Sequence, residues 1–160
     1  MHKLSERKNQ GFTIIEVLIV LAIAGLILLV VFLAVPALQR NARNTTIKAD
    51  AQNLLGGVSE YRGAKDGSTP GALSYTAGVI GYRETTSGPD ITTMKIQGST
   101  EVYTDKTTAP TTGWSETGKL WPVLRSKCNG DTAITASPRS VAVFYLVETA
   151  NNPVQKCADG

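Results

Sequence analysis

The hydrophobic pattern divides the chain into a long apolar segment near its start and a polar remainder. No charged residue occurs from residue 17 to residue 35, and the only charge between residues 12 and 39 is Glu16. A helix of about 20 residues is long enough to cross the hydrocarbon core of a membrane. We therefore predict that residues 12–38 form a membrane-spanning helix that is apolar on all sides.

Beyond residue 38 the apolar side chains follow a single stripe. Charged side chains, Asp50 among them, fall largely on other faces. Residues 39–63 are predicted to continue the helix to about residue 62 as an amphipathic half, which packs on its own head because the stripe has too few heptads for a coiled coil. The stripe residues recur every three or four positions, the spacing of one helical face, at Ile47, Ala51, Leu54, Val58 and Tyr61.

Four glycines bear on this second half of the helix. Glycine costs about 1 kcal/mol relative to alanine inside a helix, so Gly56 and Gly57 are expected to weaken it. Gly63 and Gly67 are the expected stops, because glycine is the commonest residue just after the end of a helix.

The rest of the chain is predicted to be a turn-rich connection followed by β-strands. Residues 64–90 are rich in Gly, Ser, Thr and Pro, which is typical of turns. Apolar runs after them predict strands at 91–97, 101–104, 120–124, 132–136 and 140–149. The last has two largely apolar faces and is expected to be a central strand under the helix. The predicted fold class is α+β, in which a long N-terminal helix packs on an antiparallel β-sheet head formed by residues 64–160.

Three residues depart from a plain apolar helix. A carboxylate inside a bilayer costs on the order of 2.5–3.5 kcal/mol, so Glu16 is a functional candidate unless it lies near the headgroups and meets water. Pro36 removes one helical hydrogen bond, and such breaks are tolerated in membranes where neighbouring helices compensate. Gly25 and Pro36 delimit a segment in which we expect a mild kink in the free subunit.

Charge and aromatic residues give little indication of a nucleic-acid partner. The net charge is +3, and residues 1–11 hold three basic residues against one acidic residue. A dedicated nucleic-acid binder usually shows a dense basic face. We interpret the modest basic-aromatic region as partly buried tryptophans beside ordinary surface cations, with nucleic acid as the less favoured alternative. This region consists of Trp114, Trp121, Lys119, Arg125 and Lys127.

Catalytic and metal-binding chemistry has few candidates in the sequence. The only histidine is His2, so Ser-His-Asp and Cys-His catalysis lack a base. No zinc, calcium or phosphate-binding motif appears, and the aspartates at positions 90, 105, 131 and 159 are interpreted as residues of solvated turns. We expect no enzymatic activity, no cofactor and no metal.

The two cysteines, Cys128 and Cys157, leave two interpretations open. An even number of cysteines behind a membrane segment is compatible with one disulfide in an oxidising compartment. Two unrelated buried thiols are the alternative. Cysteine spacing alone does not decide between them.

The segment Gly11-Phe12-Thr13-Ile14-Ile15-Glu16, followed by Val-Leu-Ile-Val-Leu-Ala-Ile-Ala-Gly, closely resembles the type IV pilin processing motif. The resemblance implies that residues 1–11 are a leader, which prepilin peptidase removes by cutting between Gly11 and Phe12 on the cytoplasmic side. It also implies N-methylation of the Phe12 amine and a role for Glu16 in subunit assembly.

The same resemblance extends more loosely to the rest of the chain. In filaments of this family part of the N-terminal helix loosens on assembly, and the segment from Gly25 to Pro36 is where we expect that here. Cys128 and Cys157 bracket the strand at 140–149 as the ends of a pilin D-region do, which implies a disulfide. On the loop-entropy model this bond stabilises the fold by about 3.5 kcal/mol.

The resemblance implies a structural subunit of a type IV pilus, and two alternatives are kept. One is a pseudopilin of a type II secretion or DNA-uptake (competence) machine, and the less favoured one is a membrane-anchored binding domain that never polymerises. The implied partners are copies of the chain, prepilin peptidase, the membrane, and a pilus assembly platform with its ATPase motor. The implied location is the cytoplasmic membrane, single-pass with the head outside, and then an extracellular pilus.

Properties such as adhesion, motility and DNA uptake belong to the assembled machine and are not encoded in a subunit sequence of this kind. One possible modification can be read from the sequence itself. Asn44-Thr45-Thr46 matches the N-x-[ST] glycosylation pattern close to the predicted membrane segment.

Overall fold

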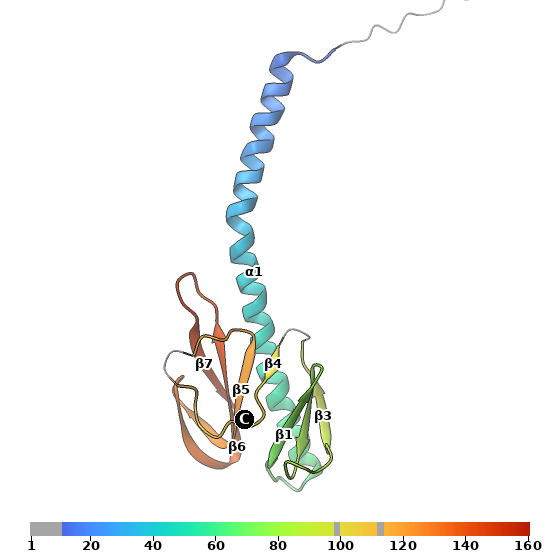
Figure 1. Cartoon of the computed structure of the whole chain (residues 1–160), viewed down its shortest axis with the longest axis vertical. Helices are drawn as coiled ribbons and strands as arrows, with labels where there is room; N and C mark the ends of the chain where they lie inside the picture. Colours follow the sequence, from blue (N-terminus) through green and yellow to red (C-terminus); the bar gives the residue numbers. More distant parts are fainter. Residues whose placement is uncertain (1–10, 98–99, 112–113) are drawn as a thin grey trace, which may run out of the picture. The chain divides into compact units, whose positions relative to one another are not determined.

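The structure is a computed structural model, which describes residues 11–97, 100–111 and 114–160. The predicted leader, apart from Gly11, therefore lies outside the described residues. The chain divides into two compact units, one ending at Gln39 and the other spanning Arg40–Gly160. The elements are α1 (Ile14–Ala64), β1 (Ala72–Thr76), β2 (Val79–Arg83), β3 (Thr92–Lys95), β4 (Glu101–Val102), β5 (Lys119–Asn129), β6 (Ala133–Val147) and β7 (Val154–Asp159) (Figure 1).

In the first unit, α1 exposes apolar side chains on every face. All residues from 11 to 39 are exposed, and the large apolar side chains range from 38% exposed at Val35 to 89% exposed at Phe12. By length and composition this helix can cross a membrane. The helix runs without interruption through Gly25 and Pro36. The loosening of this segment that we expect in a filament concerns the assembled state and stays a prediction.

In the second unit, α1 buries one stripe against the head. The five predicted stripe residues, at positions 47, 51, 54, 58 and 61, are all at most 4% exposed. The helix ends at Ala64, and Gly63 lies within it. Gly67 adopts the left-handed conformation (φ 81°) and donates its N–H to the carbonyl of Arg62 at 2.8 Å. Such a bond at a left-handed residue closes the C-terminus of a helix.

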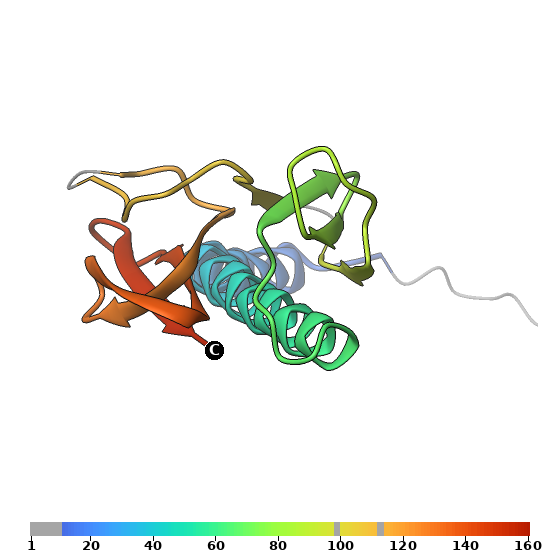
Figure 2. The ribbon, with the colours of Figure 1, turned by 90° about the horizontal axis from the view of Figure 1, so that it is seen from below.

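Two β-sheets pack against the buried stripe of α1. One has the order β1-β2-β3 and is antiparallel throughout, and the other has the order β4-β5-β6-β7, in which only the short β4–β5 pair is parallel. Figure 2 shows β1–β3 on one side of the helix and β5–β7 on the other. One hydrophobic core joins them, because side chains of α1, β1, β2, β5 and β6 all contribute to it.

The strands differ from the predicted set in three places. Residues 64–90 hold the antiparallel hairpin β1–β2, whose turn is made by Ala77 and Gly78 with positive φ angles of 49° and 82°. The segments predicted at 132–136 and 140–149 belong to the single strand β6, which indeed lies between two partners in its sheet. The third difference is β7, which was not predicted.

A bulge explains why β6 runs through Pro138. Leu124 of β5 pairs with Val141 and Ser126 pairs with Ala136, so residues 137–140 stand opposite a single residue of β5. Proline is accepted in strands where its missing N–H is not needed for the ladder. The bulge therefore lets one strand contain a residue that ordinarily ends strands.

Candidate functional site

The N-terminus of α1 is closed by the side chains of two residues, Thr13 and Glu16. The Glu16 N–H donates to the Thr13 hydroxyl at 3.3 Å. In return, the Thr13 N–H and hydroxyl donate to Oε2 of Glu16 at 2.9 and 2.8 Å. This reciprocal pattern is a capping box, which satisfies backbone donors that the helix itself leaves without partners.

Gly11 and Phe12 lie just outside this capped helix. Residues 11–13 have no regular secondary structure, and Phe12 is 89% exposed. The bond that is predicted to be cut therefore lies in exposed backbone that makes none of the helical hydrogen bonds. An apolar hollow beside it is lined by Phe12, Glu16 and three apolar side chains of the next two turns.

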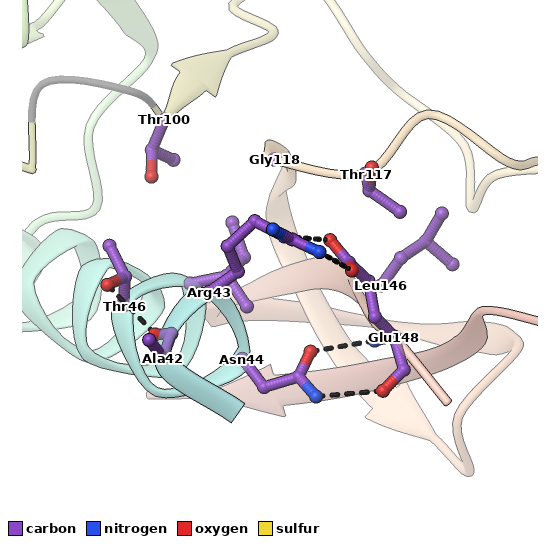
Figure 3. Close-up of a pocket in the computed structure, with 10 residues that line it drawn as sticks. Ala42, Arg43, Asn44, Thr46, Thr100, Thr117, Gly118, Leu146 and Glu148 are labelled. Atoms are coloured by element: carbon purple, nitrogen blue, oxygen red, sulfur yellow. Dashed lines mark hydrogen bonds and ion pairs between the residues drawn. The ribbon is translucent and has the colours of Figure 1, made fainter. Parts of the chain in front are cut away.

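In the second unit, Arg43 and Asn44 of α1 bind Glu148, the residue after β6 (Figure 3). The Nε and Nη2 atoms of Arg43 donate to Oε1 and Oε2 of Glu148 at 2.8 and 2.7 Å. The Asn44 side chain donates to the Glu148 carbonyl at 2.8 Å and accepts its N–H at 2.7 Å. These two bonds join Asn44 of the helix to the end of β6. The amide nitrogen, to which an N-linked glycan would attach, is thus engaged in this contact.

The electrostatics of this contact follow from its geometry. The hydrogen bonds from Arg43 hold the pKa of the Glu148 carboxyl below its ordinary value. A hollow of about 270 Å³ adjoins the pair, between α1, the residues before β5 and the end of β6. Among its lining residues the only two charged side chains are this pair, so the hollow offers a small ligand no unpaired charge.

Asp50 is fully buried, which corrects the prediction that it lies away from the packed face. Its Oδ1 accepts the N–H of Gln97 at 2.8 Å, and its Oδ2 accepts the hydroxyl proton of Thr100. Position 50 lies three residues after Ile47 and four before Leu54, so helical spacing itself placed it on the stripe. The carboxyl group thus fastens the segment between β3 and β4 to the helix.

A disulfide joins Cys128 of β5 to Cys157 of β7, with the two Cα atoms 6.0 Å apart. These strands are separated by β6 in the sheet, and strands two apart in a flat sheet lie about 9–10 Å from each other. The sheet must therefore bend where the bulge opposite Arg125 interrupts the β5–β6 register. Asp131 adds an ion pair with Lys156 at 2.6 Å, which holds β7 in the same place.

The predicted basic-aromatic region is only partly assembled. Trp114 and Trp121 pack edge to face with their ring centroids 5.5 Å apart. Lys119 is paired with Glu101 and Glu116, both at 3.2 Å. Lys106, which the prediction did not include, lies 4.9 Å from the Trp121 ring. Arg125 lines a separate hollow and Lys127 is exposed, so the tryptophans have less free positive charge beside them than the sequence suggested.

Three of the four aspartates interpreted as residues of solvated turns, at positions 90, 131 and 159, bind other parts of the protein. Asp90 accepts hydrogen bonds from Ser74 and Arg83, and Asp159 accepts one from the N–H of Cys128 at 3.0 Å. Asp105 forms a long ion pair of 3.6 Å with the neighbouring Lys106, its one ion pair among the described residues. Within the described residues, no three acidic, His or Cys side chains are grouped to hold a metal ion.

The sequence around the capping box matches a known family model, the prokaryotic N-terminal methylation motif, over residues 7–32. The chain carries the class III signal of type IV pilins. The motif indicates a prepilin of the type IV pilin or pseudopilin type. No curated protein and no solved structure matches the chain.

The structure agrees with what the motif indicates. The long apolar helix and the sheet, which is antiparallel except for β4, match the pilin-like α+β fold that was predicted. The matched segment contains Gly11, Phe12, Glu16 and Gly25, whereas Pro36 lies beyond it. Type IV pilins, whose N-terminal signal this motif describes, are structural subunits rather than enzymes.

Proposed function

We propose that the chain is a structural subunit of a type IV pilus filament. The observation that carries this proposal is the part of α1 from residue 14 to residue 38, whose large side chains are apolar and exposed on all sides apart from the single carboxylate of Glu16. Apolar surface of this extent is unfavourable in water. Lipid covers it before assembly, and the same faces of neighbouring copies cover it in the filament.

Glu16 is proposed to set the register between copies. Cleavage after Gly11 creates an ammonium group on Phe12, and N-methylation retains its positive charge. In a bundle of identical staggered helices, the ammonium of one subunit approaches the carboxylate of another. A buried charge without a partner is strongly unfavourable and a paired one much less so, so misaligned copies are penalised.

The remaining steps of the proposed pathway follow from this role. Prepilin peptidase removes residues 1–11 in the cytoplasmic membrane, where the chain spans once with its head outside. An assembly platform and its ATPase motor then add the subunit to an extracellular filament. A pseudopilin of a secretion or DNA-uptake machine shares the N-terminal chemistry and is the alternative. The proposed role needs no cofactor and no catalytic activity.

The test is the intact mass and N-terminal sequence of protein sheared from the cell surface. A chain that starts at N-methylated Phe12 in this fraction supports the pilus. Processed protein that stays with the envelope supports the pseudopilin instead, and retention of residues 1–11 on the mature chain rules out both. We expect Glu16→Gln and Glu16→Leu variants to be processed but excluded from the sheared fraction, and wild-type assembly of either would exclude the pairing.

A further inference from the structure

A polar hollow of about 620 Å³ lies on the head, beside the bulge that joins β5 and β6. It is lined by the turn after α1 at residues 66–69, by Arg125 of β5 and by residues 136–139 of β6. Ligand pockets commonly enclose about 300–1,000 Å³, so this hollow is large enough for a small organic molecule. None of its lining residues is aromatic, and the charged ones are Asp66, Arg125 and Arg139.

The charged side chains of this hollow have no ion-pair partners within the described part of the chain. Neither arginine forms an ion pair there, and Asp66 forms none with either of them. Elsewhere in the head such groups do pair, as Arg83 does with Asp90 and Lys156 with Asp131. Two cations that line one hollow repel each other, so an anion from another molecule is stabilised there.

The backbone of Arg125 has an unusual conformation. Its φ angle is 54°, in the left-handed region that residues other than glycine rarely adopt. The other described non-glycine residues with positive φ angles, Asp66 and Ala77, lie in turns, where such conformations are common. Arg125 instead stands in a strand, unpaired between Leu124 and Ser126. A bulge re-aims a side chain, and strained backbone tends to occur at binding sites.

The backbone that carries Arg139 is fixed from the side of α1. The guanidinium group of Arg62 donates to the Arg139 carbonyl, and the Thr69 hydroxyl donates to the Pro138 carbonyl. Both bonds engage carbonyl groups of the segment and none of the guanidinium nitrogens of Arg139. Because these two backbone groups are already held in place, less conformational entropy is lost when a ligand binds.

The lining residues indicate which kind of anion fits. A guanidinium group binds a carboxylate or a phosphate through two parallel hydrogen bonds. The carboxylate of Asp66 repels a polyanion, but it accepts hydrogen bonds from hydroxyl groups. Proteins that bind single-stranded nucleic acid combine a positively charged groove with aromatic rings for stacking, and the hollow has neither. The complementary ligand therefore carries one oxyanion and several hydroxyl groups.

We propose that this hollow is a binding site for an anionic sugar. Arg125 and Arg139 bind the carboxylate or phosphate group of the sugar, and Asp66 accepts hydrogen bonds from its hydroxyl groups. A singly charged anion balances the two arginines and the one aspartate. The inference goes beyond the proposed function and does not rest on it, because it concerns the folded head and applies equally to a pilin and a pseudopilin.

The test is isothermal titration calorimetry of the full chain in detergent. The probes are glucuronate, a phosphate ester of glucose, glucose itself and inorganic phosphate. We expect the two anionic sugars to bind, and glucose to bind at least about ten times more weakly because it lacks the charge-assisted hydrogen bonds. Inorganic phosphate should also bind more weakly, because it has no sugar hydroxyls for Asp66. The tighter of the two anionic sugars identifies the oxyanion as a carboxylate or a phosphate.

Variants assign the binding to this hollow. Arg125→Gln and Arg139→Gln should each weaken the binding of the tighter sugar about tenfold, the size of one lost hydrogen bond to a charged group. Lys127→Gln is the matched control, since Lys127 is an exposed cation of the same strand that does not line the hollow, and it should leave binding unchanged. Asp66→Ala should reduce the preference for the sugar over inorganic phosphate.

Several outcomes would overturn the proposal. They are failure of both anionic sugars to bind, equal binding of glucose, and equal weakening by Lys127→Gln and the arginine variants. Binding of a single-stranded DNA oligonucleotide without binding of either sugar would assign the hollow to nucleic acid instead. Circular dichroism shows whether each variant is folded. Arg139 is exposed and lies outside the left-handed region, so Arg139→Gln decides the matter even if the bulge does not tolerate a change at Arg125.

Discussion

At the scale of single residues, the contact between α1 and the head depends on a few polar side chains among many apolar ones. Asp50 is the clearest case, because it is fully buried and accepts hydrogen bonds from Gln97 and Thr100. Its removal would leave the buried Thr100 hydroxyl and the partly buried Gln97 N–H without this acceptor. An unsatisfied buried donor costs more than an ordinary hydrogen bond contributes.

We therefore expect Asp50→Ala to lower the free energy of unfolding by about 2–4 kcal/mol. The measurement is denaturant unfolding of the full chain in detergent, followed by tryptophan fluorescence. Glu60→Ala is the matched control, since Glu60 is an exposed acidic residue on the same helix, and it should change stability by less than about 0.5 kcal/mol. Equal effects of the two variants would show that the buried hydrogen bonds contribute nothing.

Glu148 gives the head a dependence on pH. Its pKa in the folded chain lies below the ordinary value of 4.5 because Arg43 donates hydrogen bonds to it. The stabilisation is therefore complete above the unfolded pKa and is lost as the pH falls through the folded one. We expect the unfolding midpoint to be constant near neutral pH and to fall below about pH 4.5.

The variant Glu148→Gln isolates the contribution of this residue to the pH dependence of stability. It should be less stable than wild type near neutral pH, and the difference should narrow in acid. The pKa values of Asp90 and Asp131 are also lowered by their cationic partners, so some acid sensitivity must remain in the variant. A stability difference that stays constant from neutral to acidic pH would contradict the role of the Arg43–Glu148 pair.

At the scale of elements, the two adjacent glycines of α1 have different environments. A Cβ atom built on Gly57 would lie 2.2 Å from the hydroxyl oxygen of Tyr82, whereas one built on Gly56 meets nothing within 4 Å. The Tyr82 hydroxyl donates to the Leu54 carbonyl at 2.7 Å. Gly57 thus lets β2 approach the helix closely. Of the two glycines that were expected to weaken the helix, only Gly57 is required by packing.

The two alanine substitutions should therefore act in opposite directions. Gly56→Ala is expected to stabilise the head by up to about 1 kcal/mol, the helix-propensity difference. Gly57→Ala should destabilise it by about 1–3 kcal/mol, because the new methyl group overpacks a full core. Thermal unfolding followed by circular dichroism measures both. The same sign for the two substitutions would contradict the close contact with Tyr82.

Element by element, the sequence predicted what depends on local periodicity. The apolar helix, its amphipathic half and the central strand around Val141 have patterns that a single segment displays by itself. The hairpin β1–β2 was missed because its short alternation, with Leu73 and Tyr75 facing Ile80 and Tyr82, lies among Gly, Ser and Thr. β7 was missed because its position depends on pairing with β6 and on the disulfide, and both are tertiary contacts.

The candidate site was predictable to a similar extent. Glu16 stands out in sequence because it is the only charge in an apolar run. Its partner Thr13 was part of the recognised motif, but its role emerges only from hydrogen-bond geometry. The Arg43–Glu148 contact joins residues far apart in the chain, and no local pattern signals such a pair.

At the scale of the whole molecule, the disulfide closes the last part of the sheet. Cys128 and Cys157 are 29 residues apart, and the strands that they join are not neighbours in the sheet. We expect Cys128→Ser to lower the free energy of unfolding by about 3 kcal/mol. The double variant with Cys157→Ser should be no less stable than the single one, because the bond is lost in both.

Denaturant unfolding under oxidising and reducing conditions measures this effect. Wild type in reductant should approach the stability of the serine variants, which themselves should not respond to reductant. If reductant left wild-type stability unchanged, the bond would not contribute to the fold. β7 would then be held by its pairing with β6 and by the ion pair between Asp131 and Lys156.

The all-round apolar surface of the first unit has a consequence for the reversibility of the proposed filament. Lipid tails are about as apolar as leucine, so a helix that leaves lipid for the side chains of its copies gains little from the hydrophobic effect. The free energy of this helix among its copies then differs only modestly from its free energy in the membrane. In the proposed filament, the apolar surface of a subunit would therefore oppose its return to the membrane only weakly.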